Sequence, residues 1–96
     1  MDDSAHEKHT TSMTIVDTLK DKVKEELEGF IEYGELYDHL TEKGMHREAS
    51  LIQEIAHDEY THAKALCRHL NHLGYDTAKD EEISNLWRDA NALLDY

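Results

Sequence analysis

Hydrophobic residues recur every three or four positions along most of this chain, which is the spacing of one face of an α-helix. The pattern predicts helices at residues of about 14–43, 45–73 and 78–94. The first two patterns are followed by Gly44 and Gly74, as is typical of a helix C-terminus. Residues 1–12 are polar and aperiodic, so we expect a loose arm there. The sequence therefore predicts an all-α fold in one domain over residues 1–96.

The connection at Gly44 is short, and this limits how the first two helices can pack. A short turn makes consecutive helices run antiparallel, so we expect a helical hairpin followed by a short C-terminal helix. Two long helices and one short helix cannot cover their own apolar faces well. We therefore expect this chain to associate with further copies of itself.

Each of the two long hydrophobic stripes is interrupted by one glutamate. The first stripe consists of Val16, Leu19, Val23, Phe30, Tyr33, Tyr37 and Leu40. The second consists of Met45, Ala49, Ile52, Ala56, Ala63, Leu66, Leu70 and Leu73. Glu26 occupies the gap in the first stripe, and Glu59 occupies the gap in the second. Because an unpaired buried carboxylate is costly, residues in such positions usually hold a partner or a metal ion.

The two glutamates also lie at similar depths along the expected hairpin. At 1.5 Å per residue, Glu26 lies about 26 Å from the turn at Lys43, and Glu59 lies about 21 Å from the turn at Met45. The difference is about one helical turn. We therefore expect the two carboxylates to face each other at nearly the same height.

His62 follows Glu59 by three residues, which gives the Glu-x-x-His pair that di-iron four-helix bundles project inward. With Glu26, one hairpin then offers half of the ligand set of such a centre. A two-fold axis between two chains would complete it, with Glu26 as terminal carboxylate, Glu59 as bridge and His62 as nitrogen ligand. We therefore expect a homodimer that forms a four-helix bundle and holds two metal ions. Tyr33, two turns after Glu26, fits either a hydrogen-bond donor to a ligand or a core tyrosine.

Charge and ligand type narrow the candidate partners. The chain has 22 acidic and 10 basic residues, a formal net charge of −12, which argues against nucleic acid and favours cations. An acidic surface is also the ordinary solvated state of many proteins. Carboxylate and imidazole ligands suit iron or manganese, and zinc remains open. The one cysteine, Cys67, and the lack of a signal peptide or membrane-spanning pattern lead us to expect a cytoplasmic protein without a membrane partner.

The arrangement of these residues resembles a known superfamily. Glu26 with Tyr33 seven positions later, followed by Glu59-x-x-His62, resembles the ferritin-like superfamily. The acidic run at residues 25–28, with Tyr33 behind it, is similar to the first helix of encapsulated ferritin-like proteins.

The resemblance covers residues 16–94 and implies a function. It implies a ferroxidase that oxidises Fe(II) to Fe(III) with oxygen, for iron storage and detoxification, at a di-iron centre shared between two chains. It also implies ring-like oligomers of such dimers inside an encapsulin nanocompartment. Glu25 and Glu28 match the positions where metal ions enter in those proteins. Two features depart from the pattern: Glu32 stands where those proteins have Trp, and residues 91–96 do not match their cargo tag.

Two other functions remain open from the sequence. The first is a rubrerythrin-like di-iron protein that reduces peroxide, for which the electrons would come from elsewhere because no Cys-x-x-Cys motif is present. The second is a non-catalytic dimeric helical module that binds metal or serves as a scaffold. The oligomer number, the native metal and the physiological oxidant are also left open.

Overall fold

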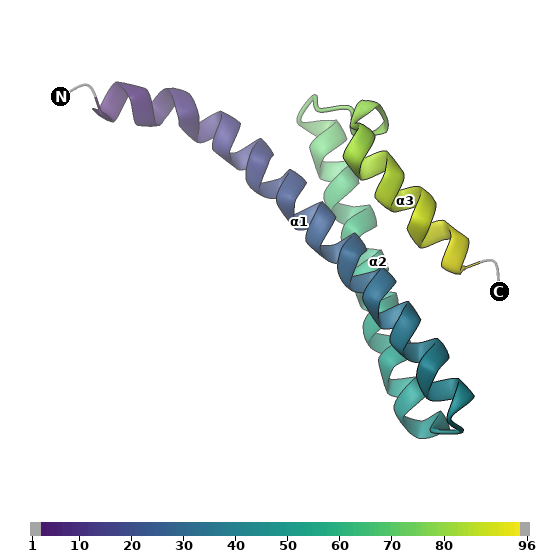
Figure 1. Cartoon of the computed structure of the whole chain (residues 1–96). Coiled ribbons are helices and arrows are strands. Elements are labelled where there is room, and N and C mark those ends of the chain that lie inside the picture. The colour runs from purple at the N-terminus through teal and green to yellow at the C-terminus, as the bar shows by residue number, and fades with distance from the viewer. Residues whose placement is uncertain (1–2, 95–96) are drawn as a thin grey trace.

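The computed structural model describes the backbone of residues 3–94 and the side chains of residues 15–94. It contains the helices α1 (Asp3–Glu42), α2 (His46–His72) and α3 (Glu81–Leu93), and a 3₁₀ turn, η1 (Thr77–Lys79). The helices α1 and α2 run antiparallel, α3 folds back beside them, and the N-terminal part of α1 projects beyond the other helices (Figure 1). The described residues contain no strand, so the predicted all-α hairpin with a short C-terminal helix is confirmed.

Two glycines end the long helices where the sequence predicts. Gly44 has φ 76° and Gly74 has φ 98°, a left-handed conformation that residues with a side chain adopt at a cost. At the first turn, the N–H of Met45 donates to the carbonyl of Leu40 at 2.9 Å, which closes the end of α1. The bounds of α2 lie within one residue of those predicted.

The predicted start of α1 near residue 14, and the loose arm over residues 1–12, are wrong for the described part of the segment. The helix begins at Asp3, and residues 1–2 lie outside the described residues, as do residues 95–96 at the other end. The chain has no proline and its first glycine is Gly29, so nothing before that position breaks a helix. Extending an existing helix costs less than starting one, so the pattern of side chains marks where α1 packs and not where it begins.

The start of α3 also differs from the prediction, because two capping residues lie close together. Asp76 accepts a hydrogen bond from the N–H of Ala78 and caps only the short turn η1. Asp80 accepts one from the N–H of Ile83 at 3.0 Å and caps α3, which therefore begins at Glu81 and not at residue 78.

The hydrophobic core lies where the three helices meet. Its fully buried large side chains are Val23, Leu27, Leu70 and Ile83. On α2 the buried small residues Ala56 and Ala63 let α1 approach closely. Phe30, Tyr60 and Trp87 contact one another in turn across the three helices. The first pair is tilted and the second edge-to-face, with ring centroids 5.2 and 5.5 Å apart. These contacts fix α2 against α1, and so set the register of the residues that face each other across the hairpin.

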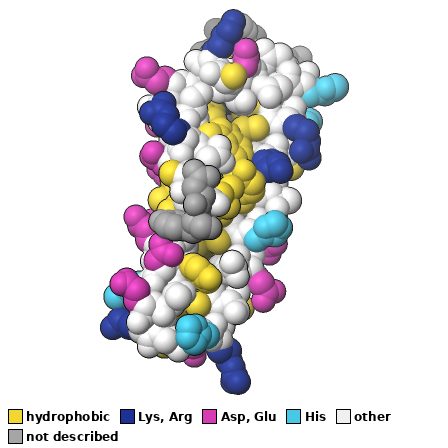
Figure 2. Space-filling view, turned by 90° about the vertical axis from the view of Figure 1, so that its right-hand side faces the viewer, with side chains coloured by type: hydrophobic (Ala, Val, Ile, Leu, Met, Phe, Trp, Pro, Cys, Tyr) yellow, Lys and Arg dark blue, Asp and Glu magenta, His cyan; other side chains and the backbone are white. Residues whose placement is uncertain are grey.

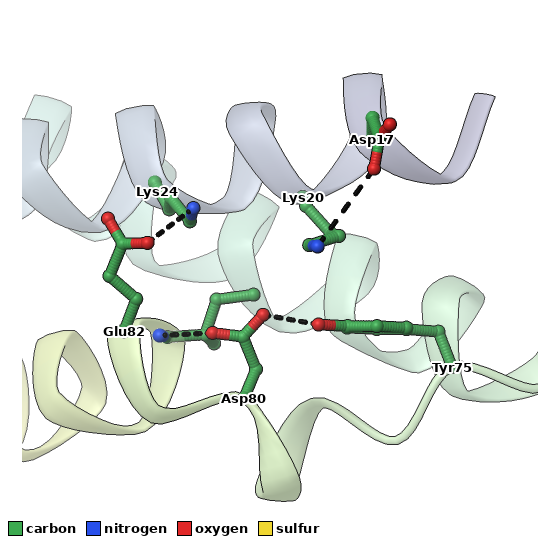
Figure 3. A network of polar contacts seen from close by, with 7 residues as sticks. Asp17, Lys20, Lys24, Tyr75, Asp80 and Glu82 are labelled. Carbon is green, nitrogen blue, oxygen red and sulfur yellow. Dashed lines mark hydrogen bonds and ion pairs between the residues drawn. The ribbon is translucent and has the colours of Figure 1, made fainter. Parts of the chain in front are cut away.

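A polar network ties α1 to the start of α3 (Figure 3). Lys24 pairs with Glu82 at 2.8 Å, and the Tyr75 hydroxyl donates to Asp80. Burial by itself raises the pKa of Asp80, but the hydrogen bonds from Tyr75 and from the N–H of Ile83 outweigh it and lower that pKa. The cap of α3 is thus held in its charged form.

The face that carries α3 remains partly apolar. Figure 2 shows hydrophobic side chains in a band along this face, with charged side chains on either side of it. Among the described residues, no helix combines the length and the apolar character needed to cross a membrane.

Candidate metal centre

The structure brings the three predicted ligands together. Glu26 extends from α1, and Glu59 and His62 extend from neighbouring turns of α2. The His62 Nδ1 atom lies 3.1 Å from the Glu26 Oε1 atom, although the two residues are 36 positions apart in the chain. When Nδ1 carries the ring hydrogen it donates to Glu26, and Nε2 stays available to a metal ion.

The prediction that Glu26 and Glu59 occupy core positions of the two hydrophobic stripes is only partly right. Leu27 and Tyr60, the residues that follow the two glutamates, fill the apparent gaps in the stripes and pack in the core. The side chain of Glu26 keeps 23% of its surface exposed, and that of His62 keeps 60%. Glu26 and Glu59 therefore lie along the edge of the core and not within it.

The two carboxyl groups interact strongly in this position. Hydrogen bonding to Glu26, followed by burial and by the charge of Glu26, raises the pKa of Glu59 from 4.5 to about 7. The charge of His62 acts in the opposite direction, and that of Asp58 adds to the increase. Two carboxylates held this close resist ionising together, and a cation between them would remove that cost. The donor set and its electrostatics therefore fit a metal ion.

Hydrophobic residues share the face of α2 that carries Glu59 and His62. Ile55, Leu66 and Leu73 follow the helical spacing of Glu59 and His62 and share their face. Leu73 is 47% exposed, and Leu51, at the far end of this face, is 57% exposed. Neither α1 nor α3 covers this face fully. Exposed leucines on the same helix face as a polar cluster are an arrangement that a second helical layer would bury.

A single chain does not form a complete site. Within the described part of the chain, no group of three or more His, Cys, Asp or Glu side chains is placed so that together they could hold a metal ion. The prediction that one chain supplies half of a shared centre is neither confirmed nor contradicted by this finding.

The other predicted site residues lie around this cluster. Glu25 and Glu28 are exposed and line an open groove of about 570 Å³ that is also bordered by Glu32 and Leu86. Glu25 pairs there with Lys22 at 3.4 Å. None of the three predicted ligands lines this groove.

Tyr33 is half-buried and packs against the core. None of the hydrogen bonds among the described side chains involves its hydroxyl group, so its predicted contact with a ligand stays a prediction.

One contact of the cluster was not predicted. Gly29 lies on α1 three residues after Glu26, and the carboxyl group of Glu59 lies directly against it. The available signal was a glycine in the interior of a predicted helix, which costs stability and often has a packing or functional reason.

Comparison with known proteins identifies the family. Residues 17–93 match the family model described as Rubrerythrin. No curated protein and no solved structure matches the chain. The matched segment includes all three predicted ligands, the groove residues and Gly29.

Proposed function

Because this chain belongs to the rubrerythrin family, within the ferritin-like superfamily, we propose that it is a ferroxidase with a di-iron centre shared between two chains. Family membership supports iron binding and redox chemistry. The observation that carries the finer proposal is the meeting of Glu26, Glu59 and His62 across the hairpin, with His62 Nδ1 3.1 Å from Glu26 Oε1.

Each chain contributes the same three ligands in this proposal. Glu26 is a terminal carboxylate, Glu59 bridges the two ions, and His62 supplies a nitrogen ligand. The open apolar face around these residues is where the second hairpin packs, which completes a four-helix bundle and encloses two iron ions per dimer. The partly exposed His62 supports this arrangement, because its ring is accessible to a group from outside the chain.

The substrates are Fe(II) and dioxygen. Each Fe(II) gives up one electron, so two of them and two protons reduce one dioxygen to hydrogen peroxide, and four of each reduce it to water. The carboxylates of Glu26 and Glu59 stabilise the higher charge of Fe(III). Glu59 gives up its carboxyl proton when it takes an ion as ligand, since only the ionised group can bridge.

The rest of the molecule would assist delivery and storage. A net charge of −12 concentrates cations around the protein, and the groove lined by Glu25, Glu28 and Glu32 of α1 is bordered by Leu86 of α3. A hairpin dimer has no storage cavity of its own, so ring-like oligomers inside an encapsulin shell would hold the mineral.

The family match is also compatible with a second function, reduction of hydrogen peroxide. In that reaction two Fe(II) ions and two protons convert one hydrogen peroxide to two water molecules. The same ligands serve both reactions. The two functions are separated by comparing the rate of Fe(II) oxidation with limiting peroxide and with limiting oxygen. The faster reaction identifies the oxidant that the centre uses.

Removal of the bridging carboxylate tests the ferroxidase proposal. We expect Glu59→Ala to lower the initial rate of aerobic Fe(II) oxidation by at least about a hundredfold, to near the protein-free rate, because each ion loses a ligand. Glu54→Ala is the matched control, since Glu54 is an exposed carboxylate on the same helix. Wild-type rates in Glu59→Ala would contradict the proposal, and equal losses in the two variants would show that the effect is not specific to the centre.

A further inference from the structure

The interior of α1 contains two glycines, Gly29 and Gly34, which the backbone does not require. Positive φ values occur only at Gly44 and Gly74 among the described glycines, so any residue could adopt the conformation at positions 29 and 34. Glycine destabilises a helix interior relative to alanine. The reason for each glycine must therefore lie in what its missing side chain would touch.

The two positions differ in the neighbour that a side chain would meet. A Cβ atom at position 34 would lie 2.9 Å from Cδ1 of Leu93, so Gly34 serves the packing of α3 on α1. A Cβ atom at position 29 would lie 3.2 Å from Oε2 and 3.3 Å from Cδ of Glu59. Both of the latter distances are shorter than ordinary van der Waals contacts. The carboxyl group of Glu59 thus occupies the space that a side chain at position 29 would need.

This space matters because the Glu59 carboxyl group that lies against Gly29 also interacts with Glu26 on the same helix. A β-carbon at position 29 would therefore displace the carboxyl group relative to Glu26 and His62 by a few tenths of an ångström. Metal–ligand distances are defined to about 0.2 Å, so a shift of this size is significant for a bridging ligand.

We propose that Gly29 is a positioning residue of the metal centre, whose missing side chain provides the space in which Glu59 can act as a ligand together with Glu26 and His62. Gly29 itself touches no metal ion. This inference rests on the proposed function, because it assigns Glu59 as a ligand.

The test compares metal binding in Gly29→Ala and Gly34→Ala. Both changes place alanine in the interior of α1, but only the first reaches Glu59. The probe is Co(II), added anaerobically and followed by its visible absorption, and helix content is followed by circular dichroism. We expect Gly29→Ala to weaken Co(II) binding by about 10- to 100-fold and to change the absorption spectrum, with helix content maintained. Gly34→Ala should bind Co(II) as the wild type does.

The outcomes separate this inference from the proposed function. Wild-type affinity and spectrum in Gly29→Ala would overturn the inference alone. Equal weakening in both glycine variants, or weakening accompanied by loss of helix content, would also overturn it, because the effect would then be general to the helix. Absence of Co(II) binding by the wild-type protein would overturn the proposed function and this inference with it.

Discussion

At the scale of single residues, the main feature is a pair of carboxyl groups and an imidazole that lie together across the hairpin. Glu59 keeps its proton up to a pH of about 7 because Glu26 lies against it. His62, on the next turn of α2, contacts the carboxylate of Glu26. Ionising both carboxyl groups of this cluster is therefore unfavourable in the folded protein, and a cation bound between them would offset that cost.

This cost predicts how the stability of the metal-free protein depends on pH. The pKa of Glu59 is about 7 in the folded state and about 4.5 when unfolded, so the folded state binds more protons between these values. The free energy of unfolding should therefore fall as the pH rises from about 4.5 to about 7. Urea denaturation in the presence of a chelator measures this slope, and Glu59→Gln should flatten it. An unchanged slope in Glu59→Gln, with the control Glu54→Gln also unchanged, would contradict this assignment.

The position of these residues along the helices was predictable, but their environment was not. The constant rise of the α-helix places Glu26 and Glu59 at similar distances from the turn, and the structure has them in contact. The hydrophobic pattern could not show that Leu27 and Tyr60 fill the core positions, because one residue changes direction on a helix by only about 100°. The contact of Glu59 with Gly29 depends on the tertiary packing of two helices, which a local pattern does not contain.

At the scale of elements, the ends of the helices show which local signals decide a structure. α2 has a glycine turn at both ends, and its predicted bounds hold within one residue. α1 has no break before Gly29, so its start could not be inferred from where its apolar stripe begins. In front of α3, Asp76 and Asp80 are both good capping residues, and only the folded chain distinguishes their roles.

The role of Asp80 can be tested by removing its side chain. Asp80→Ala removes the acceptor for the N–H of Ile83 and the partner of the Tyr75 hydroxyl, so we expect a loss of about 1 to 2 kcal/mol in the free energy of unfolding. Asp80→Asn retains an acceptor at this position and should lose less. Urea denaturation at pH 7 measures both variants. A stability of Asp80→Ala equal to that of the wild type would show that the cap does not hold α3 in place.

At the scale of the whole molecule, the single chain exposes more surface than its size requires. It measures 61 × 26 × 17 Å and has an accessible surface of 6848 Å². A compact monomer of 11.2 kDa exposes about 5,700 Å² by the usual scaling of surface with mass. The difference is about 1,100 Å², which exceeds the roughly 800 Å² that one partner buries in a standard interface. The projecting part of α1 contributes to this excess, and Leu51 and Leu73 are exposed apolar residues on the face of Glu59 that the proposed dimer would cover.

The central claim is that two chains share one centre of two iron ions, and the number of ions bound per oligomer tests it most directly. Fe(II) is added anaerobically to the metal-free protein, and the complexes are weighed by native mass spectrometry. Our account predicts dimers, or multiples of dimers, that saturate at two iron ions per dimer, and a Glu59→Ala variant that binds none at the same concentrations. Iron bound to single chains as tightly as to dimers would contradict it, and so would a dimer that binds no iron.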